Sequence, residues 1–133
     1  MITIPKKIYD SIIRHAEAGY PNEACGIVAG QASGQVTEFF PMKNADESGI
    51  SFFIDPKEQI QVFKKIRERG NQMLGIFHSH TAGEACPSKK DIRLASYSEA
   101  SYLIASLADG KKSVLRSFKI KDEAAKEEEI KIV

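Results

Sequence analysis

HSHTAGEACPSKKD, residues 78–91, supplies two imidazoles, one hydroxyl and one carboxylate within a single short segment. These groups belong to His78, His80, Ser88 and Asp91. Two imidazole nitrogens and one carboxylate oxygen form a ligand set that zinc accepts in proteins, and a catalytic zinc site leaves its fourth position to water. The stretch therefore predicts a zinc centre with His78, His80 and Asp91 as metal ligands.

The residues before this stretch predict how the histidines are presented. Met73 to Phe77 is a short apolar run, typical of a buried strand, and it leads the chain into His78. Side chains two residues apart on an extended segment point to the same side. His78 and His80 are therefore expected to converge on one point, while Ser79 turns away from it.

The serine and the aspartate are expected to begin the next element. Ser88 and Asp91 have the spacing of a capping box, which predicts a short helix running to about Ala95. The Ser88 hydroxyl has two candidate roles: it caps this helix, or it donates a hydrogen bond to the oxyanion that forms when an amide is hydrolysed. Both roles stay open.

A further carboxylate is expected at the mouth of a buried strand. Residues 23–30, EACGIVAG, are short, apolar and closed by a glycine, which indicates a buried strand with Glu23 at its entrance. A carboxylate held near a metal, but not on it, can take a proton from water and pass it to a leaving amine. Glu23 is therefore the candidate general acid and base.

The rest of the chain predicts a mixed α/β sheet flanked by helices. Helix signals cover about residues 5–18, with His15 on the solvated side, and residues 55–70, with Ile60, Val62, Phe63 and Ile66 facing the core. Further strands are expected at 35–42, 50–54, 102–107 and 114–120, the last two joined by a hairpin loop at 108–112. The charged tail, about 121–131, is expected to be a solvated helix or frayed, although Ile130, Ile132 and Val133 could add an edge strand.

Length and composition indicate one domain over residues 1–133, with no need of disulfides. The formal net charge of +1 provides no electrostatic footprint for nucleic acid or an anionic membrane. No apolar run matches a signal peptide or a membrane span, so a cytoplasmic location is expected, with Cys25 and Cys86 as thiols. Whether the chain is a monomer or a homodimer stays open.

The pattern of Glu23, His78-Ser79-His80, Ser88 and Asp91 resembles the JAMM (MPN-positive) metalloprotease family, whose signature is a glutamate upstream of His-x-His-x7-Ser-x2-Asp. The residues around Glu23 and the segment 53–56, FIDP, look like short bacterial and archaeal members. The resemblance covers about residues 1–120 and implies a curved α/β fold of the JAMM/MPN, cytidine-deaminase-like class.

For the site, the family resemblance implies one zinc ion on His78, His80 and Asp91, Glu23 as general acid and base, and Ser88 beside the oxyanion. It also implies a metallopeptidase or isopeptidase that cuts an amide bond at the C-terminal tail of ubiquitin or a ubiquitin-like protein. Short bacterial members resemble enzymes that act on ubiquitin-like sulfur carriers, which is the substrate class expected here.

Two alternative functions stay open. The first is a catalytically silent MPN scaffold, whose hallmark is a missing ligand or glutamate, and none is missing here. The second is a deubiquitinase-like isopeptidase, although few residues separate Asp91 from Tyr102, which leaves little room for insertions that grip ubiquitin chains. Cys86, in the metal loop, has no role in the family pattern and is either a bystander or a thiol that blocks the open metal position.

Overall fold

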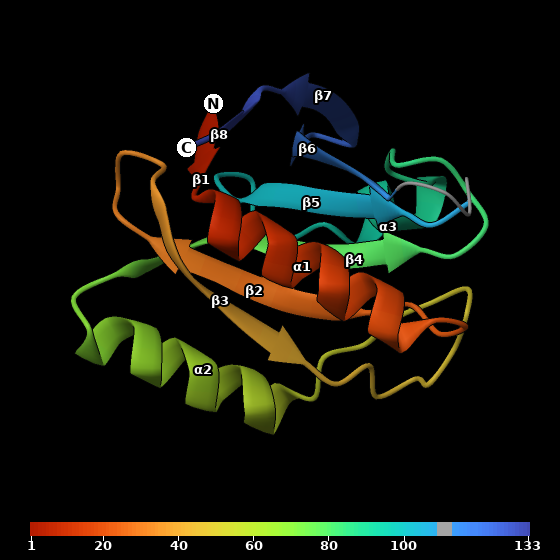
Figure 1. Ribbon diagram of the computed structural model, residues 1–133, viewed down its shortest axis with the longest axis horizontal. Helices are drawn as coiled ribbons and strands as arrows, with labels where there is room; N and C mark the ends of the chain where they lie inside the picture. The colour runs from red at the N-terminus through yellow and green to blue at the C-terminus, as the bar shows by residue number, and fades with distance from the viewer. Residues whose placement is uncertain (109–112) are drawn as a thin grey trace.

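A mixed six-stranded sheet forms the centre of the protein (Figure 1). The computed structural model describes residues 1–108 and 113–133. Neighbouring strands are antiparallel, except for β4 and β5, which run parallel. The spatial order is β3 (Val36–Met42), β2 (Cys25–Gly30), β4 (Gln72–His80), β5 (Ser101–Ser106), β6 (Val114–Lys121) and β7 (Ala124–Glu128).

Helices cover both faces of this sheet, which confirms the predicted class of a mixed sheet flanked by helices (Figure 1). On one face, α1 (Lys6–Gly19) buries Ile12 and Ala16 in a core that includes Phe77 of β4. On the other face lie α2 (Pro56–Glu68) and the short α3 (Lys89–Leu94). The alternation of a strand therefore decides which helix each side chain meets.

His78 and His80 lie at the C-terminal end of β4, a central strand of the sheet. It is longer than predicted, because it continues through His80 while pairing with β2 and β5. Cys25 of β2 lies opposite His78, and Ser106 of β5 lies opposite His80. The backbone of His78 is therefore paired on both sides, whereas that of His80 is paired with β5 alone.

Most of the predicted helices and strands are confirmed, and α2 begins as expected, with the Asp55 side chain accepting a hydrogen bond from the amide of Lys57. The prediction of the core-facing residues of α2 was partly wrong. Val62 and Ile66 are buried as expected, but Ile60 is 67% exposed. His15 was also placed wrongly. It is half-buried, and its ring nitrogen Nε2 lies 2.9 Å from the carbonyl oxygen of Cys25.

The segment 50–54 is not a strand, contrary to the prediction. Its backbone pairs with no strand; instead the side chain of Asn44 donates to the carbonyl of Ser51 and accepts from the amide of Phe53. One buried amide side chain thus supplies hydrogen bonds that a neighbouring strand would otherwise provide. The segment becomes an ordered loop along the edge of the site.

The charged tail is not a helix or a frayed end, because it forms β7 and then β8 (Ile130–Ile132). A strand does form at Ile130 and Ile132, but Val133 lies outside it and it adds no edge to the six-stranded sheet. It pairs in parallel with β1 (Ile2–Ile4), which the sequence reading missed, in a separate two-stranded sheet. Strands β5 and β6 form the predicted antiparallel pair, while most of their predicted loop, residues 109–112, lies outside the described residues. No helix in the described part of the chain is long and apolar enough to span a bilayer.

Candidate metal centre and active site

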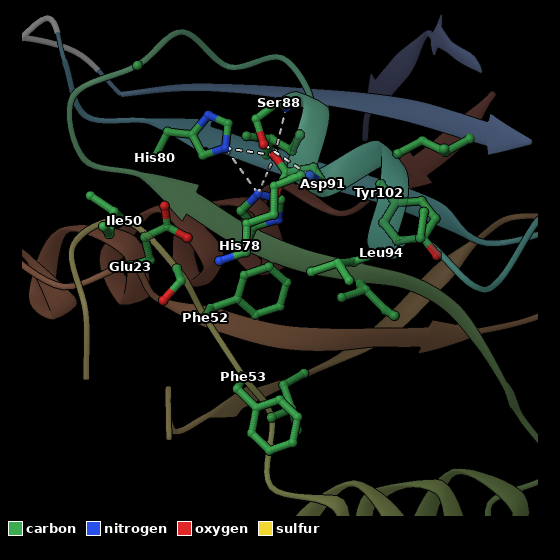
Figure 2. A pocket seen from close by; sticks show the side chains of 18 of the residues that line it. Glu23, Ile50, Phe52, Phe53, His78, His80, Ser88, Asp91, Leu94 and Tyr102 are labelled. Atoms are coloured by element: carbon green, nitrogen blue, oxygen red, sulfur yellow. Dashed lines mark hydrogen bonds and ion pairs between the residues drawn. The ribbon is translucent and has the colours of Figure 1, made fainter. Parts of the chain in front are cut away.

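Three side-chain atoms meet at the end of β4 (Figure 2). Nε2 of His78 lies 3.1 Å from Nε2 of His80, and Oδ2 of Asp91 lies 3.2 Å and 3.0 Å from these two nitrogens. At most one proton can lie between two imidazole nitrogens, and a carboxylate oxygen only accepts when ionised. A cation shared by all three atoms satisfies them together, so these residues fit a metal ion.

The two rings are held by different contacts. The Nδ1 atom of His80 lies 2.7 Å from the carbonyl oxygen of Glu84, which can only accept, so Nδ1 carries the proton and Nε2 keeps its lone pair for a metal. The His78 ring is buried, and Phe52 stacks on it with ring centroids 4.6 Å apart and planes 17° apart. Neither contact had a signal in the sequence.

Asp91 belongs both to the metal cluster, by which we mean the group of His78, His80 and Asp91 that could hold one metal ion, and to the first turn of α3. Its amide donates to the Ser88 hydroxyl oxygen at 3.0 Å, and its Oδ2 accepts from the Ser88 amide at 2.9 Å, which is the predicted capping box. Burial acts to raise the pKa of Asp91, but its interactions with the imidazoles of His78 and His80 outweigh burial and hold the pKa well below its usual range. The carboxylate is therefore ionised and oriented at neutral pH.

The histidine pKa values shift in opposite directions. Burial lowers the pKa of His78, so its ring favours the neutral form that a metal requires. The hydrogen bond with Asp91 raises the pKa of His80. A bound cation would compete with a proton at His80 more than at His78.

Glu23 lies in the same cavity as the three ligand atoms but is not one of the cluster (Figure 2). Its side chain is buried, and this burial is the main reason that its pKa rises to about 7. Ser79 holds the adjoining backbone: its hydroxyl accepts from the amide of Ala24 at 2.8 Å, and its amide donates to the carbonyl of Ala24 at 3.0 Å. Ser79 points away from the metal cluster, as predicted, and anchors the catalytic candidate.

Asn44 is the second support of Glu23, and the sequence reading missed it. Its buried amide group donates to the backbone carbonyls of Glu23 and Ser51, both at 2.9 Å. Its oxygen accepts from the amides of Asp46 and Phe53. One side chain therefore links the backbone of Glu23 to the loop that carries Phe52.

The cluster lies in a cavity of about 620 Å³. Glu23, Ser88 and Lys90 line it beside the ligands, so the structure brings together every residue that the sequence singled out for the site. Away from the ligands the walls are mostly apolar and are formed by Phe52, Phe53, Ile54, Leu94, Tyr97 and Tyr102. Cys86 is not part of the cluster; its sulfur lies 4.0 Å from the Glu84 carboxylate.

Comparisons with known proteins agree with this arrangement. A family model described as prokaryotic homologues of the JAB domain matches residues 5–121. A CysO-cysteine peptidase from Mycobacterium tuberculosis is 34% identical over 134 residues, covering 100% of this chain and 92% of the relative. A desampylase from Haloferax volcanii is 35% identical over 103 residues, covering 73% of this chain and 74% of the relative.

Solved structures share the fold. A solution structure of a protein from Desulfitobacterium hafniense has a TM-score of 0.91 at 44% identity, covering 100% of this chain and 93% of the other. The crystal structure of a JAB1/MPN domain protein from Archaeoglobus fulgidus has a TM-score of 0.65 at 16% identity, covering 99% of this chain and 97% of the other. The family match, the two relatives and the shared fold together show that this chain belongs to the prokaryotic JAB-domain family, the short JAMM/MPN type.

Proposed function

We propose that this protein is a zinc-dependent metallopeptidase that hydrolyses an amide bond at the C-terminal tail of a ubiquitin-like sulfur-carrier protein, with residues 1–133 acting as one catalytic domain. The observation that carries the proposal is the meeting of His78, His80 and Asp91 beside the buried carboxylate of Glu23. Two relatives named as a CysO-cysteine peptidase and a desampylase support the class of substrate.

Zinc fits the donor set of two imidazoles and one carboxylate and, when bound, supplies Lewis-acid activation of water and of an amide carbonyl. Glu23 accepts the proton of the attacking water at its carboxylate and then donates it to the leaving amine. A pKa of about 7 suits both steps, because the group gains and loses a proton near neutral pH.

Ser88 is proposed to stabilise the oxyanion. Its oxygen accepts the capping hydrogen bond from the amide of Asp91, which leaves the hydroxyl hydrogen free to donate toward the cavity that Ser88 lines. The cap and the catalytic role are therefore compatible. A donor of this kind is typically worth about 2.7 to 4 kcal/mol of transition-state stabilisation.

The proposal is tested by incubating the zinc-loaded protein with bacterial sulfur carriers that bear C-terminal extensions, and by weighing the products by mass spectrometry. We expect loss of the extension and gain of one water in the two products combined. A protein that is inert and also retains no zinc after careful purification would instead indicate the silent scaffold. Cleavage of ubiquitin conjugates alone would indicate the deubiquitinase-like isopeptidase.

The metal assignment has its own test. Asp91→Ala and His80→Ala should each lose bound zinc together with activity, because each removes one of three protein ligands. Metal content is measured by atomic absorption after dialysis against a weak chelator. A variant that keeps the zinc content of the wild type would remove that residue from the ligand set.

A further inference from the structure

Lys90 is a cation in the cavity to which the proposed mechanism assigns no role. Among the described residues that line this cavity it is the one lysine or arginine. Its side chain is exposed, and none of the ion pairs or side-chain hydrogen bonds formed between described residues uses its ammonium group. The ammonium is therefore available to a ligand.

The backbone around Lys90 is fixed by the start of α3, although the Lys90 side chain is exposed. It lies between Ser88 and Asp91, whose reciprocal hydrogen bonds form the capping box of α3. A cation in the first turn of a helix is disfavoured by the helix dipole, which prefers acidic residues there. Lys89 in the same turn goes against the same preference, so what distinguishes Lys90 is that it lines the cavity.

The scissile bond itself indicates what such a cation can recognise. When the group released is a terminal amino acid, its α-carboxylate sits on the carbon bonded to the scissile nitrogen. When the bond is an isopeptide to a lysine side chain, that carbon is a methylene and carries no charge. The carboxylate of Glu23 lines the same cavity and repels an incoming α-carboxylate, and the ammonium group of Lys90 can offset that repulsion.

We propose that Lys90 binds the free α-carboxylate of the residue that is released, and so selects carriers extended by an ordinary peptide bond over isopeptide conjugates. This inference rests on the peptidase function proposed above and specifies its substrate. Lys90 is then a specificity-determining residue and takes no part in proton transfer. The bond broken and the water consumed are those of the proposed hydrolysis.

The experiment uses one sulfur carrier extended by a single alanine, prepared as the free acid and as the carboxamide. The zinc-loaded wild type should hydrolyse the free acid with a kcat/KM about tenfold higher than the carboxamide, the size expected for a charge-assisted hydrogen bond. Lys90→Gln should abolish this preference, mainly through KM. An undiminished preference in Lys90→Gln would overturn the proposal.

Lys89→Gln is the matched control, because Lys89 shares the first turn of α3, is equally charged and does not line the cavity. It should keep the preference of the wild type. An equal loss in both variants would overturn the proposal by pointing to net charge. Neither substitution should lower the melting temperature, since each removes a cation from the positive end of a helix.

Binding separates this proposal from the proposed hydrolysis. The zinc-loaded Glu23→Gln protein, titrated calorimetrically with both carriers, should bind the free acid about tenfold more tightly than the carboxamide. In the double variant that carries both Glu23→Gln and Lys90→Gln, the affinities for the free acid and the carboxamide should be equal. Equal affinities while Lys90 is present would overturn its role, whereas tighter binding of the free acid without hydrolysis by the wild type would overturn only the catalytic proposal.

Discussion

At Glu23, the surroundings change what an ordinary carboxylate can do. Burial raises its pKa to about 7. The Ser79 hydroxyl accepts a hydrogen bond from the amide of the adjoining Ala24, and Asn44 donates one to the carbonyl of Glu23. The residue is therefore close to the metal cluster without joining it, which is the position that proton transfer requires.

Glu23→Gln should keep the zinc content of the wild type while hydrolysis falls about 10²- to 10⁴-fold, because the amide has nearly the same shape but transfers no proton. Product formation is followed by mass spectrometry, and zinc is measured on the same sample. Activity near that of the wild type would exclude Glu23 as the proton carrier. Loss of zinc would instead identify it as a ligand.

At the scale of the element, α3 begins inside the candidate metal site, since Ser88 caps the helix and Asp91 in its first turn contacts His78 and His80. The two candidate roles of Ser88 can be separated by substitution. Glycine at an N-cap costs only a few tenths of a kcal/mol, whereas alanine costs about 1 kcal/mol.

Ser88→Gly should therefore unfold at nearly the same denaturant concentration as the wild type and still lose about 10²- to 10³-fold in kcat, because the oxyanion loses a donor. Urea unfolding and steady-state kinetics measure the two effects. A kcat that follows stability across the glycine and alanine variants would show that Ser88 is a cap alone.

The loop from Asn44 to Phe53 is the second element that the site depends on. Asn44→Ala should destabilise the protein by about 2 to 4 kcal/mol, because it leaves several buried backbone groups without partners. It should also lower activity, since the loop carries Phe52 onto His78. Asp46→Ala is the control: it removes one exposed hydrogen bond, and a loss as large as that of Asn44→Ala would contradict the argument.

At the scale of the whole molecule, the half-buried carboxylate of Glu128 joins the last strands of the six-stranded sheet to the start of the chain. Glu128 accepts hydrogen bonds from Ser101 of β5 and Ser117 of β6, and its other oxygen lies 3.4 Å from the amino group of Met1. Burial acts to raise the pKa of Glu128, but the two serine hydroxyls outweigh it and lower the pKa below its ordinary value. The carboxylate therefore links β5, β6, β7 and the start of the chain.

Because the folded pKa of Glu128 lies below its unfolded value, its contribution to stability is complete above the ordinary glutamate pKa and is lost as the pH falls through the lower, folded value. Glu128→Gln should destabilise the protein by about 1 to 2 kcal/mol at pH 7 and by progressively less in acid. Urea unfolding across this pH range measures the difference. The exposed Glu129→Gln is the control, and a Glu128→Gln effect that does not change with pH would contradict the assignment.

The meeting of His78, His80 and Asp91 could be predicted from the sequence because these three residues lie in one short segment with local signals. The i, i+2 spacing of His78 and His80 and the capping box of Ser88 and Asp91 each depend on a few neighbouring residues. The amphipathic helices were predictable for the same reason. The catalytic roles of Glu23 and Ser88 stay predictions, although the structure places both in the cavity.

What the sequence by itself determined is therefore the grouping of candidate metal ligands in residues 78–91, the family pattern and the elements with strong local periodicity. Only the tertiary structure decided that residues 50–54 form a loop held by Asn44, that residues 124–128 of the charged tail form a strand, and that Phe52 stacks on His78. The physical reason is that strand pairing and burial depend on partners far along the chain. A β-like run without a neighbouring strand stays a loop, and a charged run beside the free edge of β6 becomes β7.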